Sequence, residues 1–465
     1  MSGALEGIYE PGVVDPGCPS PNGTTPFWHS QPHPRANHQS KWPSDIVDVV
    51  IIGAGLTGMS LIRSMLKKKP GIRIVLLDAR SLCSGATGRN GGHCKTMTFA
   101  MWEERKRSFG IEEAIRLSAF EHAHLEVMAN AIEEDNIDCD LCLTQGIEAY
   151  YDQKDFEKAV AGLEDMRSHA PHLAEKHTVY TDTKYLTDVL KLSPRAVGAI
   201  AVPAASMWPY KWITGVLGPL IDQDKINVQT NTPVTSITDR VQDEYATVKT
   251  ARGDIRAKHV VHATNAWLGR LLPELRPFIS PLRGNVLSYA PTAGGKSPLG
   301  LKSDYSLWLR YGVKDYDYLI QRKDGRVIVG RANTGRKAVG DDSQTDLGPL
   351  SHLRGFAHEA LASPEADAAT KVSHAWAGIL AFSQDGVPFA GRLPFPGRSH
   401  QWVCGGYHAT GMIKAFLTSQ MVAGLILGEE PGEDFPQSIF ATSDRIRQLR
   451  ISLDTGGPVL TKARL

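Results

Sequence analysis

Residues 47–58 read Val47-Asp48-Val49-Val50-Ile51-Ile52-Gly53-Ala54-Gly55-Leu56-Thr57-Gly58, and this stretch decides the fold. Its first six residues form a nearly continuous apolar run, which is typical of a strand in the middle of a parallel sheet. Residues 59–69 place Leu, Ile and Met at helical spacing, and a Pro-Gly pair then stops the helix. A second apolar run, residues 72–77, ends at Asp78. These segments predict one complete strand–helix–strand unit with parallel strands.

The glycines of this stretch have the G-x-G-x-x-G spacing of a dinucleotide-binding turn. Gly53 permits the tight turn, Gly55 lets a pyrophosphate approach the backbone, and Gly58 lets helix and strand pack closely. The start of the helix offers free N–H groups and a positive dipole to the phosphates. Asp78 follows the last glycine by about 20 residues, where an acid bonds a ribose hydroxyl and disfavours NADP. The alternative is a strand–helix–strand unit that binds no ligand. The strand, the glycines, the helix and the acid together argue against this alternative.

FAD and NAD share this fingerprint, and two further features favour FAD. The chain carries one such fingerprint, which argues against a reductase with separate FAD and NADPH sites. A second Gly-rich loop, residues 84–92, follows; an NAD dehydrogenase has no need of it, whereas FAD must be threaded past its pyrophosphate to place the flavin ring. Arg89 and the loop amides supply hydrogen-bond donors to phosphate or flavin. The cofactor is expected to contact Asp78, Ala79, Arg80, Ser84, Ala86, Thr87, Arg89, Asn90, Gly91 and Gly92.

The composition is that of an ordinary globular protein. The 465 residues allow two or three domains, and 42% are hydrophobic and 22% charged. The formal net charge is +1 and no dense basic block occurs, so no nucleic-acid partner is expected. No apolar run approaches the roughly 20 residues that span a bilayer, so no membrane span is expected. The six cysteines are too few for a disulfide scaffold; Cys139 and Cys142 are interpreted as incidental thiols, and no metal site is predicted.

The two ends of the chain differ from the rest. Residues 1–44 include a Pro-, Gly- and Ser-rich stretch without the apolar core of a signal peptide. We interpret them as an extension draped over the folded body through Phe27 and Trp28. The last three residues, Ala463-Arg464-Leu465, fit a relaxed form of the peroxisomal address Ser-Lys-Leu. This predicts a peroxisomal location, which suits a protein that makes H2O2; the alternative is the cytoplasm.

Further motifs are spread over most of the chain. They are Phe27-Trp28, Val49 to Gly55, Gly88-Arg89-Asn90-Gly91-Gly92, Ala263-Thr264-Asn265-Ala266, Pro281-Leu282-Arg283-Gly284, Trp376-Ala377-Gly378, Asp385-Gly386-Val387-Pro388 and Gly405 to Met412. With these motifs the chain resembles the D-amino-acid oxidase-like superfamily of FAD oxidoreductases. Within it, the chain looks most like the gamma-glutamylputrescine oxidase and glycine/sarcosine oxidase branch. The combination is specific to the superfamily and not to a substrate.

The resemblance implies an α/β (α+β) fold, in which a Rossmann-type FAD-binding domain carries an inserted substrate domain with a mixed, antiparallel sheet. The FAD-binding domain is expected to be discontinuous and to comprise residues 45–110, 195–275 and 372–440. Residues 111–194 and 276–371 are assigned to the substrate domain, and residues 441–465 to a C-terminal tail.

The resemblance also implies roles at the cofactor. The backbone of Val234 would contact the adenine side, and Ala263 and Thr264 would lie near the ribose and pyrophosphate. A later loop would cover the pyrimidine edge of the flavin with its amides and with the positive end of the next helix, which stabilise the charge of reduced flavin. That loop comprises Gly406, Tyr407, His408, Thr410, Gly411 and Met412.

Two positions depart from the sarcosine-oxidase pattern. Members of that group attach FAD to a Cys near the position of Gly378, and this chain has no Cys there. A Lys that activates oxygen in that group falls on Ile328 here. FAD is therefore expected to be held non-covalently, with a covalent link through His93 as the alternative. The missing Lys leaves acceptors other than O2 open.

The implied activity is oxidation of the C–N bond of an amine or amino acid, with hydride passing to flavin N5. O2 is the expected acceptor, giving H2O2 and an imine. The alternative is an FAD dehydrogenase or a biosynthetic tailoring enzyme that acts on a larger amine with another acceptor. A third class, a protein that binds FAD without turnover, stays open.

Candidate catalytic residues lie beside the two flavin loops and in the later hairpin. They are His93, Lys95, His408 and Arg322. Lys95 or Arg322 would bind a substrate carboxylate, and His408 would poise the amine or the flavin edge. Trp308 and Tyr311 are either pocket walls or core residues.

Overall fold

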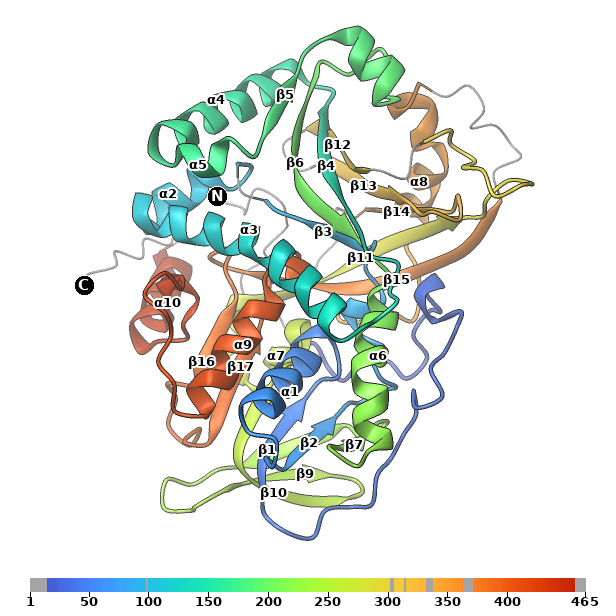
Figure 1. Cartoon of the computed structure of the whole chain (residues 1–465). Coiled ribbons are helices and arrows are strands. Elements are labelled where there is room, and N and C mark those ends of the chain that lie inside the picture. Colours follow the sequence, from blue (N-terminus) through green and yellow to red (C-terminus); the bar gives the residue numbers. More distant parts are fainter. Residues whose placement is uncertain are drawn as a thin grey trace.

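The computed structural model describes residues 15–97, 99–301, 305–312, 315–331, 338–362 and 371–455. In these residues two large β-sheets occupy the lower and upper halves of the view in Figure 1, with helices packed around them. The first sheet contains the predicted strand–helix–strand unit, and the second is mixed and largely antiparallel. The predicted α/β fold with a Rossmann-type unit and a second sheet is therefore confirmed.

The first sheet is built around parallel strands. Its strands are β1 (Val47–Ile52), β2 (Ile74–Leu77), β7 (Asn227–Gln229), β8 (Val234–Thr238), β9 (Ala246–Thr250), β10 (Gly253–His262), β16 (Phe389–Arg392) and β17 (Gln401–Gly405). The order is β16-β17-β10-β1-β2-β7, and β8 and β9 extend it from β10 as an antiparallel meander. β1 is parallel to both β2 and β10, and β10 is parallel to β17. The carboxyl ends of these strands meet at one edge, where ligands bind in such sheets.

Alternate residues of β1 pack on opposite faces of this sheet. Val49 and Ile51 share a core with three helices, α1 (Leu56–Lys68), α6 (Pro209–Asp222) and α9 (Ala415–Ile426). Figure 1 shows α1 between α9 and α6 on one face of the sheet. Val50 and Ile52 instead pack against the meander on the other face. Both faces are covered, which explains why the strand is apolar almost throughout.

The second sheet brings together strands from distant parts of the chain. They are β3 (His93–Lys95), β4 (Cys142–Tyr150), β5 (Thr178–Tyr180), β6 (Gly198–Ser206), β11 (Ile279–Tyr289), β12 (Tyr305–Gly312), β13 (Asp315–Gln321), β14 (Val327–Arg331) and β15 (Val372–Ser383). The order is β15-β11-β14-β13-β12-β4-β6-β3, with β5 on β6. β4 and β12 are parallel, and the other pairs are antiparallel. The predicted hairpin is β13–β14, whose turn contains Gly325 at a φ of 84°.

The sheets divide the chain differently from the predicted domain ranges. β3, β6 and β15 are strands of the second sheet, although the sequence assigns residues 45–110, 195–275 and 372–440 to the FAD-binding domain. β15 pairs with β11 along nearly its whole length. An apolar run in a sequence indicates a strand but not the sheet that it joins, because pairing depends on residues far away.

Helices complete the fold. They are α2 (Trp102–Phe109), α3 (Ile111–Glu134), α4 (Gln153–His169), α5 (Pro171–Ala174), α7 (Leu268–Leu271), α8 (Leu347–Ala360) and α10 (Ser443–Thr455). α8 packs on the outer face of the second sheet. α10 lies within the range predicted as a tail, and its Arg445 forms a two-point ion pair with Asp385, at 2.8 Å and 3.0 Å. The tripeptide Ala463-Arg464-Leu465 lies outside the described residues.

Residues 15–44, called the strap below, run across the body. Phe27 and Trp28 are buried against Trp208, with ring centres 4.9 Å and 5.8 Å from it. The amide of Thr24 donates to the carbonyl oxygen of Asp342 at 2.9 Å. Farther along, the amide of Ser40 donates to Val228 of β7 at 2.8 Å. The strap thus contacts both halves of the molecule.

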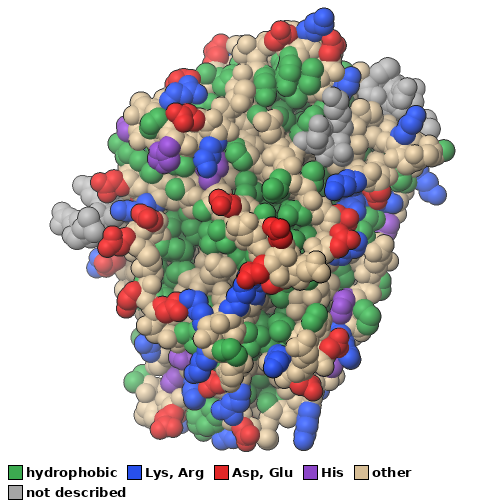
Figure 2. All heavy atoms as spheres, viewed as in Figure 1, with side chains coloured by type: hydrophobic (Ala, Val, Ile, Leu, Met, Phe, Trp, Pro, Cys, Tyr) green, Lys and Arg blue, Asp and Glu red, His purple; other side chains and the backbone are tan. Residues whose placement is uncertain are grey.

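The surface agrees with the balanced net charge. Figure 2 shows acidic and basic side chains interspersed over one face, with no extended area of one sign. None of the helices in the described ranges is long and apolar enough to cross a membrane. Within the same ranges no group of three His, Cys, Asp or Glu side chains could hold a metal ion. The six cysteines are free thiols.

Candidate functional site

A cavity runs from the carboxyl edge of the first sheet to the facing side of the second. One end is lined by the fingerprint turn, by residues 78–80 after β2 and by residues 232–234 at the start of β8. The other end is lined by side chains of β3, β11, β12 and β13. Most of the predicted cofactor residues line it, namely Gly53, Gly55, Asp78, Ala79, Arg80, Ser84, Ala86, Thr87, Arg89, Asn90, Gly91, Val234, Ala263, Thr264, Tyr407, Thr410, Gly411 and Met412.

The three glycines of the fingerprint turn serve different purposes. Gly53 has a φ of 118°, and a Cβ there would lie 2.5 Å from the carbonyl oxygen of Ala263. A Cβ at Gly58 would overlap the carbonyl oxygen of Gly53, so this glycine lets α1 pack on β1 and does not line the cavity. Gly55 does line it, and its missing side chain leaves the start of α1 open. This geometry suits a phosphate at the helix N-terminus.

Asp78 closes the turn at the end of β2. Its Oδ2 accepts a hydrogen bond from the amide of Ala54, and its Oδ1 accepts one from the amide of Arg80, both at 2.8 Å. Burial raises the pKa of Asp78, and the two amides oppose that rise. A carboxylate has about four acceptor positions, so Asp78 can also take a ribose hydroxyl. Residues 17–19 of the strap cover this end of the cavity.

The Gly-rich loop, residues 84–92, is braced by Arg89. Its guanidinium donates to the carbonyl oxygens of Ser84 at 2.7 Å and Ala377 at 2.8 Å. It also pairs with the buried carboxylate of Asp342 at 3.2 Å, which Arg80 shares at 2.9 Å. Burial lowers the pKa of Arg89 to about 10, although Asp342 favours its charge. Arg89 therefore holds the loop in place while lining the cavity, and no sequence signal identified Asp342 as its partner.

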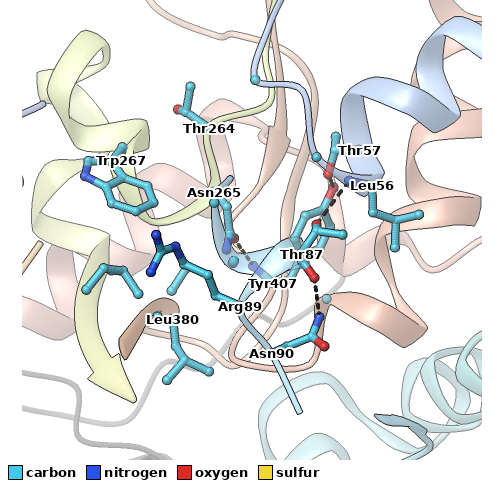
Figure 3. Close-up of a pocket in the computed structure, with 18 of the residues that line it drawn as sticks. Leu56, Thr57, Thr87, Arg89, Asn90, Thr264, Asn265, Trp267, Leu380 and Tyr407 are labelled. Carbon is cyan, nitrogen blue, oxygen red and sulfur yellow. Dashed lines mark hydrogen bonds between the residues drawn. The ribbon is translucent and has the colours of Figure 1, made fainter. Parts of the chain in front are cut away.

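Thr87 joins the same loop to α1. Its Oγ1 accepts a hydrogen bond from the amide of Leu56 at 3.1 Å, and Asn90 donates to its carbonyl oxygen at 3.1 Å (Figure 3). One free amide at the start of the helix is thus already satisfied by Thr87. The loop and the helix present one continuous surface to a ligand.

Asn265 organises the loop after β17, and sequence reasoning missed this role. Its Oδ1 accepts hydrogen bonds from the amides of Gly406 at 3.1 Å and Tyr407 at 3.2 Å (Figure 3). The hydroxyl of Tyr407 lies 2.9 Å from Oγ1 of Thr57, which ties the loop to α1. Asn265 has a φ of 49°, which Asn tolerates better than most residues. An Asn three residues after the end of a buried strand, β10, was the available signal.

His408 does not reach the cavity, which corrects its predicted role. It is 2% exposed, and its Nδ1 donates to the carbonyl oxygen of Ser383 at 3.0 Å. Burial lowers the pKa of His408 to about 3. The backbone reverses at His408 and Ala409, with φ values of 48° and 60°, and this turn carries the imidazole away from the cavity. His408 is therefore not placed to touch flavin or substrate.

Arg322 also lies outside the cavity. It follows β13, where its guanidinium donates to Asp140 at 3.1 Å and lies 4.9 Å from the ring centre of Trp208. Its charge and its aromatic contacts are used within the protein, so a carboxylate-binding role is not supported. Gly92 and Gly406, predicted as cofactor contacts, likewise do not line the cavity.

The second sheet supplies a polar and aromatic wall. Strand alternation points Trp308 of β12 and Tyr316 and Tyr318 of β13 into the cavity, beside His93 of β3. Tyr311, predicted together with Trp308, lies on the opposite face with the α8 core. Trp308 and Tyr311 are three positions apart, and side chains an odd number of positions apart on a strand point to opposite faces of the sheet.

Lys95 lines the same end and is already ion-paired. Its Nζ lies 2.5 Å from Oε1 of Glu148, and both side chains are fully buried. Glu148 also accepts a hydrogen bond from Nε of Arg310 at 3.2 Å. Burial favours the neutral acid, but Arg310 and Lys95 hold the pKa of Glu148 at about 2. The neighbouring His93 stays neutral, because burial and the charge of Lys95 lower its pKa to about 3.

The lining of the cavity fits FAD in polarity. The hydroxyl groups of Ser84 and Thr264 line it, and both are buried without a hydrogen-bond partner among the described residues. Such groups are costly unless a ligand completes them. Toward the second sheet the lining becomes apolar, with Val286, Leu380 and Met412. The polar half suits a ribose and pyrophosphate, and the apolar half suits a flat ring system.

Comparison with known proteins agrees with this geometry. A model of the FAD dependent oxidoreductase family matches residues 48–425. The chain is 27% identical to a probable oxidoreductase, OrdL, of Rhizobium meliloti, over 90% of this chain and 89% of that one. It is 23% identical to the gamma-glutamylputrescine oxidoreductase of Escherichia coli, over 82% of this chain and 84% of that one.

Solved structures share the fold. The crystal structure of glycine oxidase from Geobacillus kaustophilus superposes with a TM-score of 0.68 at 18% identity, covering 84% of this chain and 98% of that one. L-proline dehydrogenase from P. horikoshii superposes with a TM-score of 0.66 at 18% identity, covering 89% of this chain and 99% of that one.

Proposed function

The chain belongs to the family of FAD-dependent oxidoreductases, and we propose that it oxidises a carbon–nitrogen bond of an amine or amino acid. The observation that carries this proposal is the cavity that joins the dinucleotide turn to the polar and aromatic wall on the second sheet. When bound, FAD supplies the acceptor for the hydride that leaves the carbon beside the nitrogen. The similarity to a gamma-glutamylputrescine oxidoreductase supports an amine or amino acid as the substrate class.

The residues of the chain have three tasks in this reaction. Gly55 and the start of α1 hold the phosphates, and Asp78 holds a ribose. The wall of the second sheet positions the substrate over the flavin and excludes water, which aligns the reacting atoms. His93 is neutral at ordinary pH and can accept or donate a hydrogen bond without adding charge. A dedicated general base is not required by this chemistry.

We propose O2 as the acceptor, with H2O2 and an imine as products, on the strength of the glycine oxidases among the relatives. The alternative is a dehydrogenase, or a tailoring enzyme for larger amines, that uses another acceptor. The observation that favours the alternative is Ile328, which is fully buried in the second sheet. The resemblance assigns the oxygen-activating lysine of the sarcosine-oxidase group to this position.

We propose that FAD is held without a covalent bond. Cys18 of the strap is the one cysteine among the described residues of the cavity lining, and it lies at the adenine end. At Gly378 the neighbouring Arg89 side chain leaves little room, since a Cβ would lie 3.0 Å from its Cβ. The remaining candidate for a link is His93. Release of the yellow colour into the supernatant on acid precipitation supports non-covalent binding. A pellet that stays yellow in the wild type and becomes colourless in His93→Ala supports a covalent link through His93.

The function is tested by an anaerobic screen of amines and amino acids against the purified protein, following loss of flavin absorbance. Bleaching by one class, followed by H2O2 release in air, is the expected result. A protein that binds FAD but is bleached by no member of a broad panel would contradict amine oxidation. Gly55→Leu, which fills the phosphate approach, is expected to abolish FAD binding. Gly71→Leu, at an open turn where a Cβ meets nothing within 4 Å, is the matched control.

A further inference from the structure

The first described residues of the strap cross the cofactor cavity at its adenine end. Residues 17–19 are part of the lining there, together with Arg270 of α7. None of residues 15–20 is buried, whereas Phe27 and Trp28 farther along the strap are 5% and 0% exposed. Residues 15–20 are therefore held by polar contacts near the surface and not by the burial of large side chains.

One carboxylate holds the start of this segment. Oδ2 of Asp15 accepts hydrogen bonds from Nη1 of Arg270 at 3.3 Å and from Nη2 of Arg276 at 2.9 Å. Its Oδ1 accepts a hydrogen bond from the amide of Gly17 at 2.9 Å, where the backbone turns with a φ of 72°. Asp15, Arg270 and Arg276 are called the latch below. The Asp15 side chain thus ties the strap to the two arginines and shapes the turn that leads over the cavity.

The two arginines of the latch differ in their position. Arg276 does not line the cavity, and its Nε donates to the carbonyl oxygen of Gly269 at 3.0 Å. A Cβ at Gly269 would lie 3.2 Å from the Cα of Arg276, so the two residues pack closely. Arg270 does line the cavity, and a hydrogen bond with the Cys18 thiol and the charge of Asp15 raise its pKa. A substitution of Arg276 therefore alters the latch without altering the wall of the cavity.

The segment is held again a few residues later. The carbonyl oxygen of Pro16 would lie 2.5 Å from a Cβ at Gly340, so the backbone of the strap packs directly on this glycine. The guanidinium of Arg80 donates to the carbonyl oxygen of Ser20 at 3.2 Å. Thr24 then forms the hydrogen bonds that fix the strap to the second half of the protein. Residues 15–20 thus cross the adenine end between the latch and Thr24.

The latch is a weak contact by its exposure. The side chains of Asp15, Arg270 and Arg276 are 32%, 41% and 29% exposed. Ion pairs near the surface contribute little to stability and are weakened further by salt. Segments with few buried apolar contacts open locally at a lower free energy than the core does. The latch contacts also join protein groups to one another, so their formation does not require the cofactor.

We propose that the latch is a gate for FAD. When Asp15 separates from the two arginines, residues 15–20 swing away from the adenine end, and the dinucleotide enters or leaves there. This inference goes beyond the proposed reaction, because it concerns the loading of the cofactor and holds for any substrate. Since the latch forms with or without FAD, breaking it speeds up both entry and release and leaves the Kd nearly unchanged.

The test measures the two rates with FAD itself and needs no substrate. Release is followed by flavin fluorescence after dilution of the FAD-loaded protein. Binding is followed by the change in flavin fluorescence when FAD is mixed with protein from which the cofactor has been removed. Asp15→Asn and Arg276→Gln are each expected to raise both rates about twofold to fivefold, the range that corresponds to an exposed ion pair.

Two further measurements assign the effect to the latch. The double variant is expected to match Asp15→Asn alone, because removal of the carboxylate already breaks both ion pairs. High salt is expected to speed up release from the wild type more than release from Asp15→Asn. Arg35→Gln is the matched control: Arg35 is also a residue of the strap and pairs with Asp222 at 2.6 Å, outside the lining of the cavity. Its two rates should equal those of the wild type.

Three results would overturn the inference. The first is wild-type rates in both latch variants. The second is faster release with an unchanged rate of binding, because the latch would then be a contact of bound FAD and not a gate. The third is equal acceleration in Arg35→Gln, which would assign the effect to the strap as a whole. The outcome is independent of the reaction: a gate found in a protein that no amine bleaches would keep this inference and refute amine oxidation.

Discussion

At the scale of single residues, Glu148 holds together a buried charge cluster behind the substrate wall. It contacts both Lys95 and Arg310, and its own side chain is fully buried. Glu148→Gln leaves two buried cations without their carboxylate, and removal of one partner of a buried ion pair costs about 3–5 kcal/mol. We expect a loss of this size in the free energy of unfolding, measured by urea denaturation.

The control for this variant is Glu103→Gln. Glu103 pairs with Lys106 at 3.1 Å and is 52% exposed. An exposed pair contributes about 0–1 kcal/mol, so the unfolding midpoint should barely move. Equal effects of the two substitutions would show that the Glu148 cluster does not stabilise the fold.

Glu148 also gives the stability a defined pH dependence. Its pKa is about 2 in the folded protein against an ordinary value of 4.5, so folding favours the ionised form. A depressed carboxyl pKa stabilises the fold above the ordinary pKa, and this contribution is lost as the pH falls through the folded pKa. The difference in unfolding free energy between the wild type and Glu148→Gln should be full above pH 4.5 and shrink steadily toward pH 2. A difference that stays constant over that window would contradict the assignment.

At the scale of elements, the strap closes the cofactor cavity. Oγ1 of Thr24 accepts hydrogen bonds from Nη1 of Arg89 at 3.1 Å and from the amide of Ala377 at 2.9 Å. Thr24→Val removes the oxygen that accepts both hydrogen bonds, in a strap whose residues 17–19 line the adenine end. We expect FAD to dissociate about twofold to tenfold faster, since a hydrogen bond contributes about 0.5–1.5 kcal/mol. Flavin fluorescence after dilution measures the rate.

Thr235→Val is the control for the strap. Thr235 is exposed on β8, and its Oγ1 donates to the carbonyl oxygen of Lys249 at 3.0 Å. Its FAD release should match the wild type. If Thr24→Val released FAD no faster than this control, the strap would cover the cavity without holding the cofactor.

Strand alternation is the element-scale rule that separates Trp308 from Tyr311. The two residues look equivalent as pocket-wall candidates, but only side chains two positions apart share a face of a strand. Leu307 and Leu309 pack with the α8 core, which sends Trp308 to the cavity and Tyr311 to the core side. The wall residues Tyr316 and Tyr318 follow the same rule and could have been predicted from it.

At the scale of the whole molecule, the cofactor would connect the two sheets, because both line one cavity. A ligand that binds only the folded state stabilises it by about 2.7 kcal/mol when the free ligand concentration is 100 times the Kd. Removing FAD should therefore lower the Tm. ADP-ribose, which lacks the flavin ring, should restore less stability than FAD at equal saturation, as measured by differential scanning fluorimetry. Equal stabilisation by both would mean that the second sheet does not contact the ring.

The sequence alone determined the strand–helix–strand unit, its glycine turn and Asp78, because consecutive residues specify those features through strand polarity, helix periodicity and backbone geometry. The tertiary structure decided the rest of the site. It turned His408 and Arg322 away from the cavity, and it placed Asn265, Glu148 and Tyr318 where they act. These placements depend on contacts between segments far apart in the chain, and the pairing of strands in the second sheet fixes them. No local pattern encodes such pairing, so only the folded chain reveals it.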